Sequence, residues 1–192
     1  DERIGRKFLN AGAGFGGSCF RKDMNALIAF SNQLGYKPNL LKAVLNVNER
    51  QALHIVELAR QQLGGFHKKR VAILGLSFKP DTDDVRDAPS LRIVERLLKE
   101  GASVAVYDPV AMKNIRGIFG KRIDYASSAK NCLLRADCCV VVTQWDDFRG
   151  LTPNDFIENM RQPVLIDGRN IYDPVEFGRS LKYAGVGLSP SK

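Results

Sequence analysis

The sequence has little of several residue types on which common protein functions depend. Its 192 residues include two histidines, one tryptophan and four cysteines. The two histidines, His54 and His67, lie too far apart to suggest a metal site. No apolar run approaches the roughly 18 residues that a membrane-spanning helix needs, and no signal peptide opens the sequence. These absences argue against a metal site and a membrane span.

The four cysteines, Cys19, Cys132, Cys138 and Cys139, form neither a disulfide framework nor a CxxC pair. Cys138 and Cys139 lie in an apolar run, where they are expected to point to opposite faces of a strand as small hydrophobic side chains. Thiols without a disulfide framework suit a reducing compartment, so we expect a cytoplasmic protein.

Positive charge is in excess but scattered. The chain has 29 Lys and Arg against 21 Asp and Glu, a formal net charge of +8. The basic residues are not interleaved with aromatic ones, as they are in many nucleic-acid-binding proteins, so we expect no nucleic-acid partner. The excess suits a solvated basic surface, with a contribution from binding a small phosphate-bearing substrate.

A glycine-rich stretch near the start is the feature most suggestive of chemistry. Four glycines within residues 12–17 allow positive φ angles and the close approach of a ligand. Ser18 is predicted to cap the helix that follows, which puts Cys19 in a first turn where the helix dipole favours a thiolate. Lys22 and Asp23 follow within one turn. A buried structural cysteine is the alternative, but the adjacent loop and charges favour a reactive one.

The segment after this loop is predicted to be helical. One helix is expected over residues 19–34, and a longer one over residues 39–63, where apolar residues repeat with the helical period. At 1.5 Å per residue the second helix would be roughly 38 Å long. We interpret it as packing across a subunit interface or joining two domains; the alternative is a helix along its own domain. A domain boundary near His67 divides the chain into residues 1–66 and 67–192.

From residue 68 onward, continuous apolar strands alternate with helices. This pattern predicts a Rossmann-like α/β fold, with a mainly parallel sheet covered on both faces. The predicted strands cover residues 71–74, 104–107, 123–125, 138–143 and 164–166. The predicted helices cover residues 89–100, a stretch after Pro109, and residues 129–135, 153–160 and 174–182.

Ligands of such sheets bind at the carboxyl ends of the strands. Three loops there carry polar and aromatic residues: 77–86, 143–148 and 167–170. A lysine beside an aromatic ring, with arginines on neighbouring loops, suits a nucleobase and a diphosphate. The first loop lacks the GxGxxG fingerprint, so NAD is not expected to bind there in the usual manner.

Taken together, these motifs resemble the central and C-terminal portions of the UDP-glucose/GDP-mannose dehydrogenase family. The family often has proline where Arg21 stands. The residues that carry the resemblance are 3–5 with 7–9, 14–20 with Lys22 and Asp23, 75–82, Arg86, 107–109, Thr143 with Trp145, and 167–169.

The resemblance implies a two-step, NAD-dependent oxidation of UDP-glucose to UDP-glucuronate. Cys19 matches the nucleophile, which forms a thiohemiacetal and then a thioester, a sequence for which a thiol is suited. Asp23 matches the carboxylate that orders water or acts as a base. Lys22 either adds positive potential near the thiolate or is solvated. GDP-mannose and UDP-N-acetylmannosamine are the alternative substrates.

The resemblance also implies which residues hold the ligands. Phe78 and Lys79 match a nucleotide-binding pair, Arg169 matches a substrate contact, and Arg86 matches an arginine that reaches NAD. Arg3 resembles an arginine supplied across a dimer to a neighbour's sugar site. For each arginine a surface ion pair is the alternative. The loop that wraps the sugar and diphosphate is matched by Asn10, Ala11, Gly12, Ala13, Gly14, Phe15 and Gly16.

The family's N-terminal NAD-binding domain is absent from these residues. We therefore expect this chain alone to bind a UDP-sugar weakly or not at all and to show no turnover. We also expect a homodimer formed through the helix over residues 39–63. The alternative functions are a nucleotide-sugar-binding module without catalysis and a dimerisation module without a ligand.

Overall fold

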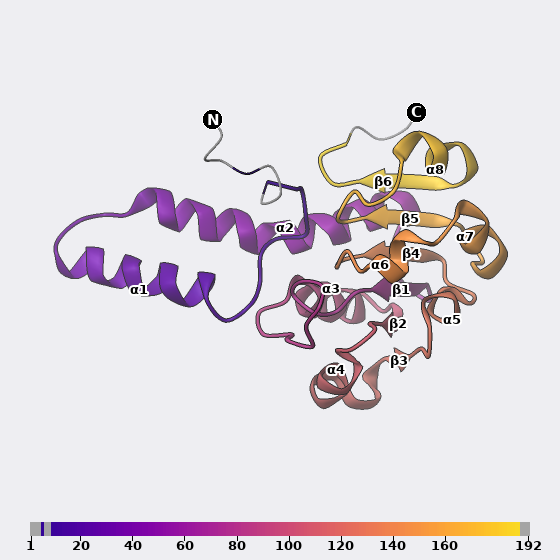
Figure 1. Ribbon diagram of the computed structural model, residues 1–192, viewed down its shortest axis with the longest axis horizontal. Coiled ribbons are helices and arrows are strands. Elements are labelled where there is room, and N and C mark those ends of the chain that lie inside the picture. Colours follow the sequence, from indigo (N-terminus) through magenta and orange to yellow (C-terminus); the bar gives the residue numbers. More distant parts are fainter. Residues whose placement is uncertain (1–4, 6–8, 189–192) are drawn as a thin grey trace.

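The chain folds as a helical hairpin followed by a sheet that is covered on both faces (Figure 1). The computed structural model describes residue 5 and residues 9–188. Helices α1 (Phe20–Gln33) and α2 (Asn39–Leu63) lie side by side and extend away from the sheet. The bounds of α2 match the predicted helix, and Gly64 ends it in the left-handed conformation, with φ 73°.

The start of α1 differs by one residue from the prediction. Cys19, not Ser18, is the N-cap, and no side chain caps the helix. The Ser18 hydroxyl instead lies 3.7 Å from the sulfur of Cys19. The predicted cap at Ser18 is therefore wrong, because the helix begins one residue later, at Phe20.

Six parallel strands form one sheet in the order β3-β2-β1-β4-β5-β6. The order reverses between β1 and β4, which lie next to each other although two strands separate them in the chain. Such a reversal opens a crevice at the carboxyl ends of the two strands. The strands are β1 (Arg70–Leu74), β2 (Ser103–Tyr107), β3 (Asp124–Tyr125), β4 (Cys138–Val141), β5 (Val164–Asp167) and β6 (Lys182–Gly185).

Helices cover both faces of this sheet (Figure 1). The C-terminal half of α2 packs on one face together with α3, and α5, α7 and α8 pack on the other. The helices after α2 are α3 (Pro89–Lys99), α4 (Met112–Phe119), the 3-10 helix η2 (Gly120–Arg122), α5 (Ala129–Leu133), α6 (Asp146–Arg149), α7 (Pro153–Asn159) and α8 (Pro174–Ser180).

Two hydrophobic cores lie on the two faces of the sheet. Cys138 belongs to the core beneath α2 and α3, and Cys139 belongs to the opposite core, as predicted. Burial raises the pKa of both thiols, and it raises the pKa of Cys132 to about 12. Neutral thiols in these positions act as small hydrophobic side chains.

The sequence prediction missed two elements. The last helix was predicted to reach residue 182, but α8 ends at Ser180 and β6 begins at Lys182. The apolar run after Lys182 pairs with β5 because this edge of the sheet is open to it. The short helix α6 lies in what was predicted to be a loop over residues 143–148. Among the described residues, no helix has the length and apolar character needed to cross a membrane.

Glu100 joins α2 to α3 and provides a test of this packing. Its carboxylate accepts hydrogen bonds from Arg60 of α2, with Nε 3.1 Å from Oε2, and from Arg96 of α3, with Nε 2.6 Å from Oε1. The hydrogen bond from Arg60, and to a smaller extent that from Arg96, lowers the pKa of Glu100 below its ordinary value of 4.5. The stabilisation is therefore present above pH 4.5 and is lost as the pH falls through that value toward the lowered pKa.

We expect Glu100→Gln to reduce the free energy of unfolding by about 1 kcal/mol at pH 7, because it removes charge-assisted hydrogen bonds from a partly exposed group. Urea unfolding at pH 7 and at roughly pH 3.5 measures the difference. The difference in the free energy of unfolding between the variant and the parent should be smaller at the acid pH. An equal gap at both values would contradict a role for the ionised carboxylate.

Candidate functional site

A cavity of about 980 Å³ lies between the glycine-rich loop, the first half of α2 and the carboxyl ends of β1, β4 and β5. The predicted binding residues Phe78, Lys79 and Arg169 come from the strand ends, as does Gln144. The glycine-rich loop and α2 form the other walls. The full lining consists of Asn10, Gly12, Gly14, Phe15, Gly16, Phe20, Leu40, Ala43, Val44, Val47, Asn48, Gln51, Phe78, Lys79, Gln144 and Arg169.

The glycines of the loop make room for protein atoms as well as for the cavity. A Cβ on Gly14 would lie 2.8 Å from the side-chain oxygen of Asn48, and one on Gly16 would lie 2.6 Å from the carbonyl oxygen of Asp87. A Cβ on Gly17 would lie 2.9 Å from the ring of Phe78. Glycine is therefore required at these positions for contacts of the loop with the rest of the protein, and the close approach of a ligand stays a prediction.

Two polar residues of α2 hold this loop, and neither belongs to a motif that predicts this role. Asn48 is buried; its Oδ1 accepts from the Phe15 N–H at 2.7 Å, and its Nδ2 donates to the Phe15 carbonyl at 3.0 Å. Gln51 donates from Nε2 to the Gly12 carbonyl at 3.2 Å. A polar residue inside the apolar stripe of a predicted helix was the signal for Asn48.

We expect Asn48→Leu to loosen the glycine-rich loop, because the N–H and the carbonyl group of Phe15 would both lose their hydrogen-bond partner. The apolar stripe of α2 would be kept. The expected cost is about 1–3 kcal/mol of stability, with backbone amide exchange at Phe15 at least about tenfold faster. Hydrogen exchange followed by mass spectrometry measures both effects. Asn46→Leu, at an exposed position of the same helix, is the matched control. Unchanged exchange at Phe15 would contradict the role of Asn48.

The three predicted catalytic residues lie together at the start of α1 but not in the lining of the cavity. Cys19 is exposed, whereas its chain neighbours Gly16 and Phe20 line the cavity. Lys22 and Asp23 form an ion pair, with Nζ 3.3 Å from Oδ1, and their side chains are 73% and 66% exposed. The ammonium group of Lys22 is thus paired with the carboxylate of Asp23.

Arg86 is a cation in the loop that contacts the chain leading to Cys19. Its guanidinium pairs with Asp84 through Nε at 3.0 Å from Oδ1 and Nη2 at 2.7 Å from Oδ2. The hydrogen bond to Asp84 is the largest cause of the raised pKa of Arg86, and the negative form of Cys19 adds a smaller effect. The Gly17 N–H also donates to the Arg86 carbonyl at 2.8 Å. The predicted NAD-contacting arginine therefore lies beside the start of α1.

Two cations of the cavity have no ion-pair partner among the described residues. Lys79 is exposed, with its ammonium 5.6 Å from the ring centre of Phe78. Arg169 is half-buried, and burial lowers the pKa of its guanidinium, although Asp167 partly opposes the shift. Cations without carboxylate partners in a cavity favour an anionic ligand.

Buried carboxylates fix the loops that carry these cations. Asp167, at the end of β5, accepts from the backbone N–H groups of Arg169 at 3.0 Å, Ile171 at 2.8 Å and Tyr172 at 3.1 Å. The Tyr183 hydroxyl of β6 also donates to Asp167, at 3.0 Å. These hydrogen bonds attach the loop that carries Arg169 to the end of β5 and to β6.

Asp108 does the same for the loop after β1. It accepts from the backbone N–H groups of Leu76 at 2.7 Å and Ser77 at 3.1 Å. Trp145, from the loop after β4, donates its indole N–H to the same carboxylate at 3.1 Å. Asp108 thus connects the loops after β1, β2 and β4 just before Phe78.

The remaining predicted residues are placed as follows. Asn10 lines the cavity, Ala13 is buried beneath the loop, and Ala11 is exposed outside the lining. Arg3 lies outside the described residues. Within the described part of the chain, no group of three or more His, Cys, Asp or Glu side chains could hold a metal ion.

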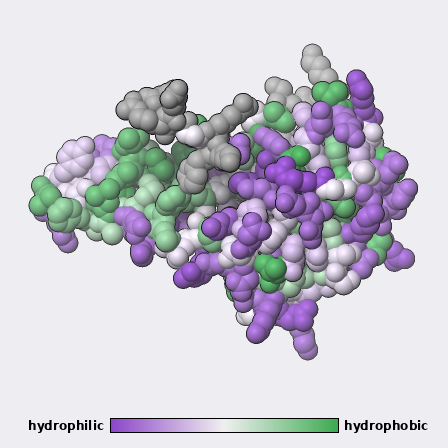
Figure 2. Space-filling view, in the orientation of Figure 1, coloured by the Kyte–Doolittle hydropathy of each residue, from purple (hydrophilic) through white to green (hydrophobic). Residues whose placement is uncertain are grey.

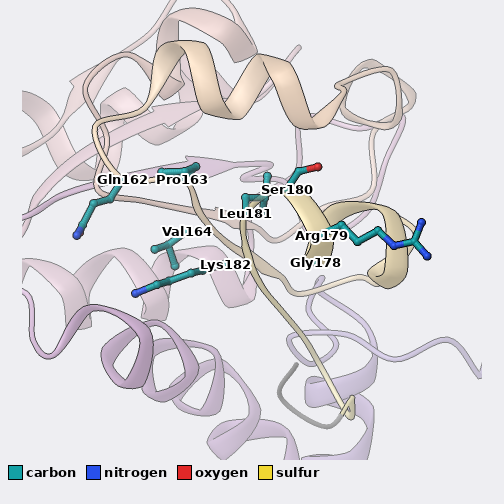
Figure 3. Close-up of a pocket in the computed structure, with 8 residues that line it drawn as sticks. All are labelled: Gln162, Pro163, Val164, Gly178, Arg179, Ser180, Leu181 and Lys182. Carbon is teal, nitrogen blue, oxygen red and sulfur yellow. The ribbon is translucent and has the colours of Figure 1, made fainter. Parts of the chain in front are cut away.

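A second cavity, of about 380 Å³, lies at the amino ends of β5 and β6 (Figure 3). Arg179 points away from it on one side, and Gln162 and Lys182 point away on the other. Because its polar groups do not converge, this cavity is a weaker candidate for a binding site than the one lined by Lys79 and Arg169.

Two family models match the chain. The UDP binding domain of the UDP-glucose/GDP-mannose dehydrogenase family matches residues 72–174, and the central domain of that family matches residues 1–50. The matched ranges include Cys19 in one part and the loops bearing Lys79 and Arg169 in the other.

Two named relatives and one solved structure agree with this match. UDP-glucose 6-dehydrogenase AglM of Haloferax volcanii is 47% identical over 171 residues, which are 89% of this chain and 39% of that protein. UDP-glucose 6-dehydrogenase TuaD of Bacillus subtilis is 41% identical over 172 residues, 90% of this chain and 37% of that protein. The structure of a UDP-glucose dehydrogenase from the hyperthermophilic archaeon Pyrobaculum islandicum is similar with a TM-score of 0.87 and 38% identity, over 98% of this chain and 41% of that structure. The chain thus spans about two fifths of the length of each.

Proposed function

Because the chain belongs to the UDP-glucose/GDP-mannose dehydrogenase family, we propose that it is the central and nucleotide-binding portion of a UDP-glucose 6-dehydrogenase. The observation that carries the proposal is the pair of cations without ion-pair partners among the described residues, Lys79 and Arg169, in one cavity. Residues 1–66 would form the active-site loop and the helical segment, and residues 67–192 the UDP-sugar domain. An N-terminal NAD-binding domain would complete the enzyme.

We assign the diphosphate of the substrate to Lys79 and Arg169. Opposite charge in a partly enclosed cavity favours this placement, because each cation there lacks a carboxylate partner among the described residues. The loop bearing Phe78 would hold the uracil, and the loop over residues 10–16 would enclose the sugar. The hydrogen bonds from Asn48 and Gln51 keep that loop against α2 before any ligand binds.

The described residues fit one contact to NAD, not a complete site. Arg86 lies beside the start of α1, but its guanidinium is paired with Asp84 and its side chain is 70% exposed. NAD⁺ supplies a hydride acceptor for each of the two oxidations. We assign to Arg86 one contact with NAD⁺. The N-terminal domain would provide the rest of the NAD⁺ site.

Cys19 is assigned the covalent step. Its thiolate would add to C6 of the aldehyde to form a C–S bond, giving a thiohemiacetal, and loss of a hydride from C6 would leave a thioester. Water then adds at C6, the C–S bond breaks, the sugar carboxylate is released and the thiolate of Cys19 is regenerated. Asp23 would order this water or accept its proton. Lys22 either adds positive potential or is solvated, and its ion pair with Asp23 favours a role through that carboxylate.

We also propose a cytoplasmic homodimer formed through the helical hairpin. Apolar side chains cluster over α1 and α2 at the end away from the sheet (Figure 2). On α1 and at its C-terminal end, Leu27 is 52% exposed, Phe30 59% and Leu34 70%. Exposed apolar surface of this kind marks an interaction site. In such a dimer, Arg3 would reach the sugar site of the partner subunit.

Turnover of the complete enzyme with competing substrates tests the proposal. We expect oxidation of UDP-glucose in preference to GDP-mannose and UDP-N-acetylmannosamine, with two NADH formed per sugar. Preference for either competitor would reassign the substrate within the same chemistry. A nucleotide-sugar-binding module without catalysis is the second candidate, and the position of Cys19 outside the cavity lining favours it. Binding of UDP-glucose without any turnover would support that alternative.

A further inference from the structure

The chain on either side of Cys19 is tied to one loop of the sheet domain. Two residues before Cys19, the Gly17 N–H donates to the Arg86 carbonyl oxygen at 2.8 Å. Two residues after it, Nη1 of Arg21 donates to Oδ1 of Asp87 at 3.4 Å. The two acceptors are consecutive residues in the loop between β1 and α3. The loop therefore holds both flanks of Cys19.

The backbone conformation of Asp87 and one of its side-chain oxygens are energetically unfavourable. Its φ of 52° is in the left-handed region, which residues other than glycine seldom adopt. Its Oδ1 also pairs with Arg92 of α3, and its Oδ2 is buried without a hydrogen-bond partner among the described residues. Its carbonyl oxygen is the atom that a Cβ on Gly16 would meet at 2.6 Å. A strained residue with an unsatisfied oxygen at a loop contact points to a functional constraint.

Besides these hydrogen bonds, the start of α1 is supported by the ring of Phe20, which packs edge-on against Phe15 of the glycine-rich loop with the ring centres 5.8 Å apart. No residue of α1 is buried, and its N-cap, Cys19, receives no side-chain capping bond. Arg21 also pairs with Glu49 of α2, so this one guanidinium joins α1, α2 and the loop before α3. Without Asp87, the first turn of α1 would be tied through Arg21 only to α2. That end of the hairpin could then shift relative to the cavity.

We propose that Asp87 is a positioning residue: through Arg21 it fixes the first turn of α1, and with it the sulfur of Cys19, relative to Arg86 and the cavity. The proposal rests on the proposed function, because the position of this sulfur affects turnover only if the sulfur reacts. Asp87 is not in the cavity lining, so its effect should be on the chemical step rather than on substrate binding.

Asp87→Asn in the complete enzyme tests the proposal. We expect kcat to fall about 10- to 100-fold, because displacing a reacting group by about 1 Å has effects of that size. KM for UDP-glucose should change less than about threefold. Arg21→Lys, which keeps the charge but not the geometry of the guanidinium, should give an intermediate kcat. The matched control is Glu95→Gln, which removes the carboxylate that pairs with Arg122 at 2.9 Å and should leave kcat unchanged.

Alkylation of Cys19 by iodoacetamide gives a readout that does not depend on turnover. Modification of the peptide containing Cys19 is followed by mass spectrometry in the complete enzyme. We expect Asp87→Asn to change the alkylation rate at least about fivefold, and Glu95→Gln to leave it unchanged. If Asp87→Asn does not fold, Arg21→Gln breaks the same contact from a half-buried position on the helix.

The outcomes separate the two proposals. A parent enzyme that makes no UDP-glucuronate, with an altered alkylation rate in Asp87→Asn, would reject the proposed function and leave the structural link standing. An active parent with unchanged kcat in Asp87→Asn would overturn the positioning role, whatever the alkylation rate. A loss of affinity for UDP-glucose with normal kcat would overturn it as well.

Discussion

In the complete enzyme, Cys19→Ser is expected to reduce the formation of UDP-glucuronate at least about 10³-fold. A serine hydroxyl is neutral at pH 7 and is a far weaker nucleophile than a thiolate without an activating base, so the covalent step fails. The first oxidation does not need the sulfur, and the yield of NADH should therefore fall from two per UDP-glucose to at most one. Measuring NADH and product over a complete time course gives both quantities.

The exposed neighbour of Cys19 supplies the control for this substitution. The Ser18 hydroxyl lies 3.7 Å from the Cys19 sulfur but has no assigned chemical role. Ser18→Ala therefore alters the same turn without removing a reacting group. We expect it to retain turnover. Normal acid formation by Cys19→Ser would show that the sulfur has no covalent role and would favour a binding module without catalysis for this chain.

Arg169→Gln is expected to have opposite effects on ligand affinity and on stability. The half-buried guanidinium, whose pKa burial lowers, has no ion-pair partner among the described residues, so removing its charge should leave the stability of the free protein unchanged or higher. Affinity for UDP-glucose should fall about 10- to 100-fold, because charge-assisted hydrogen bonds are worth about 1.5–3 kcal/mol. Calorimetric titration and thermal unfolding of the complete enzyme measure the two effects.

The second cavity supplies a matched substitution. Arg179→Gln removes a guanidinium that points away from its cavity (Figure 3), and we expect no change in the affinity for UDP-glucose. If Arg169→Gln destabilised the free protein as well as weakening binding, the cation would have a structural role. Unchanged affinity would contradict its assignment to the diphosphate.

Local sequence patterns were sufficient for much of the fold. The helical period and Gly64 gave the bounds of α2, and the alternation of apolar strands with helices gave the parallel sheet. The period of two in strands placed Cys138 and Cys139 on opposite faces. The strand β6 was missed because it lies at the sheet edge and its position depends on pairing with β5, which is a long-range contact.

The candidate site was predicted less completely, because its geometry depends on contacts between distant parts of the chain. The motifs brought Phe78, Lys79 and Arg169 to one edge of the sheet, and these residues line one cavity. No local pattern could show that Asn48 holds Phe15, since 33 residues separate them. Nor could the sequence show that Cys19 lies outside the cavity lining, because the placement of the first turn of α1 depends on contacts with the distant loop before α3.

The most direct test of the account is to trap the covalent intermediate. Asp23→Asn should slow the attack of water on the thioester, so that the intermediate accumulates in the complete enzyme. After mixing with UDP-glucose and NAD⁺ and quenching in acid within the first turnover, the peptide containing Cys19 is analysed by mass spectrometry. We expect a UDP-glucuronyl thioester on Cys19. An unmodified Cys19 peptide throughout the time course of an enzyme that still makes UDP-glucuronate would contradict it.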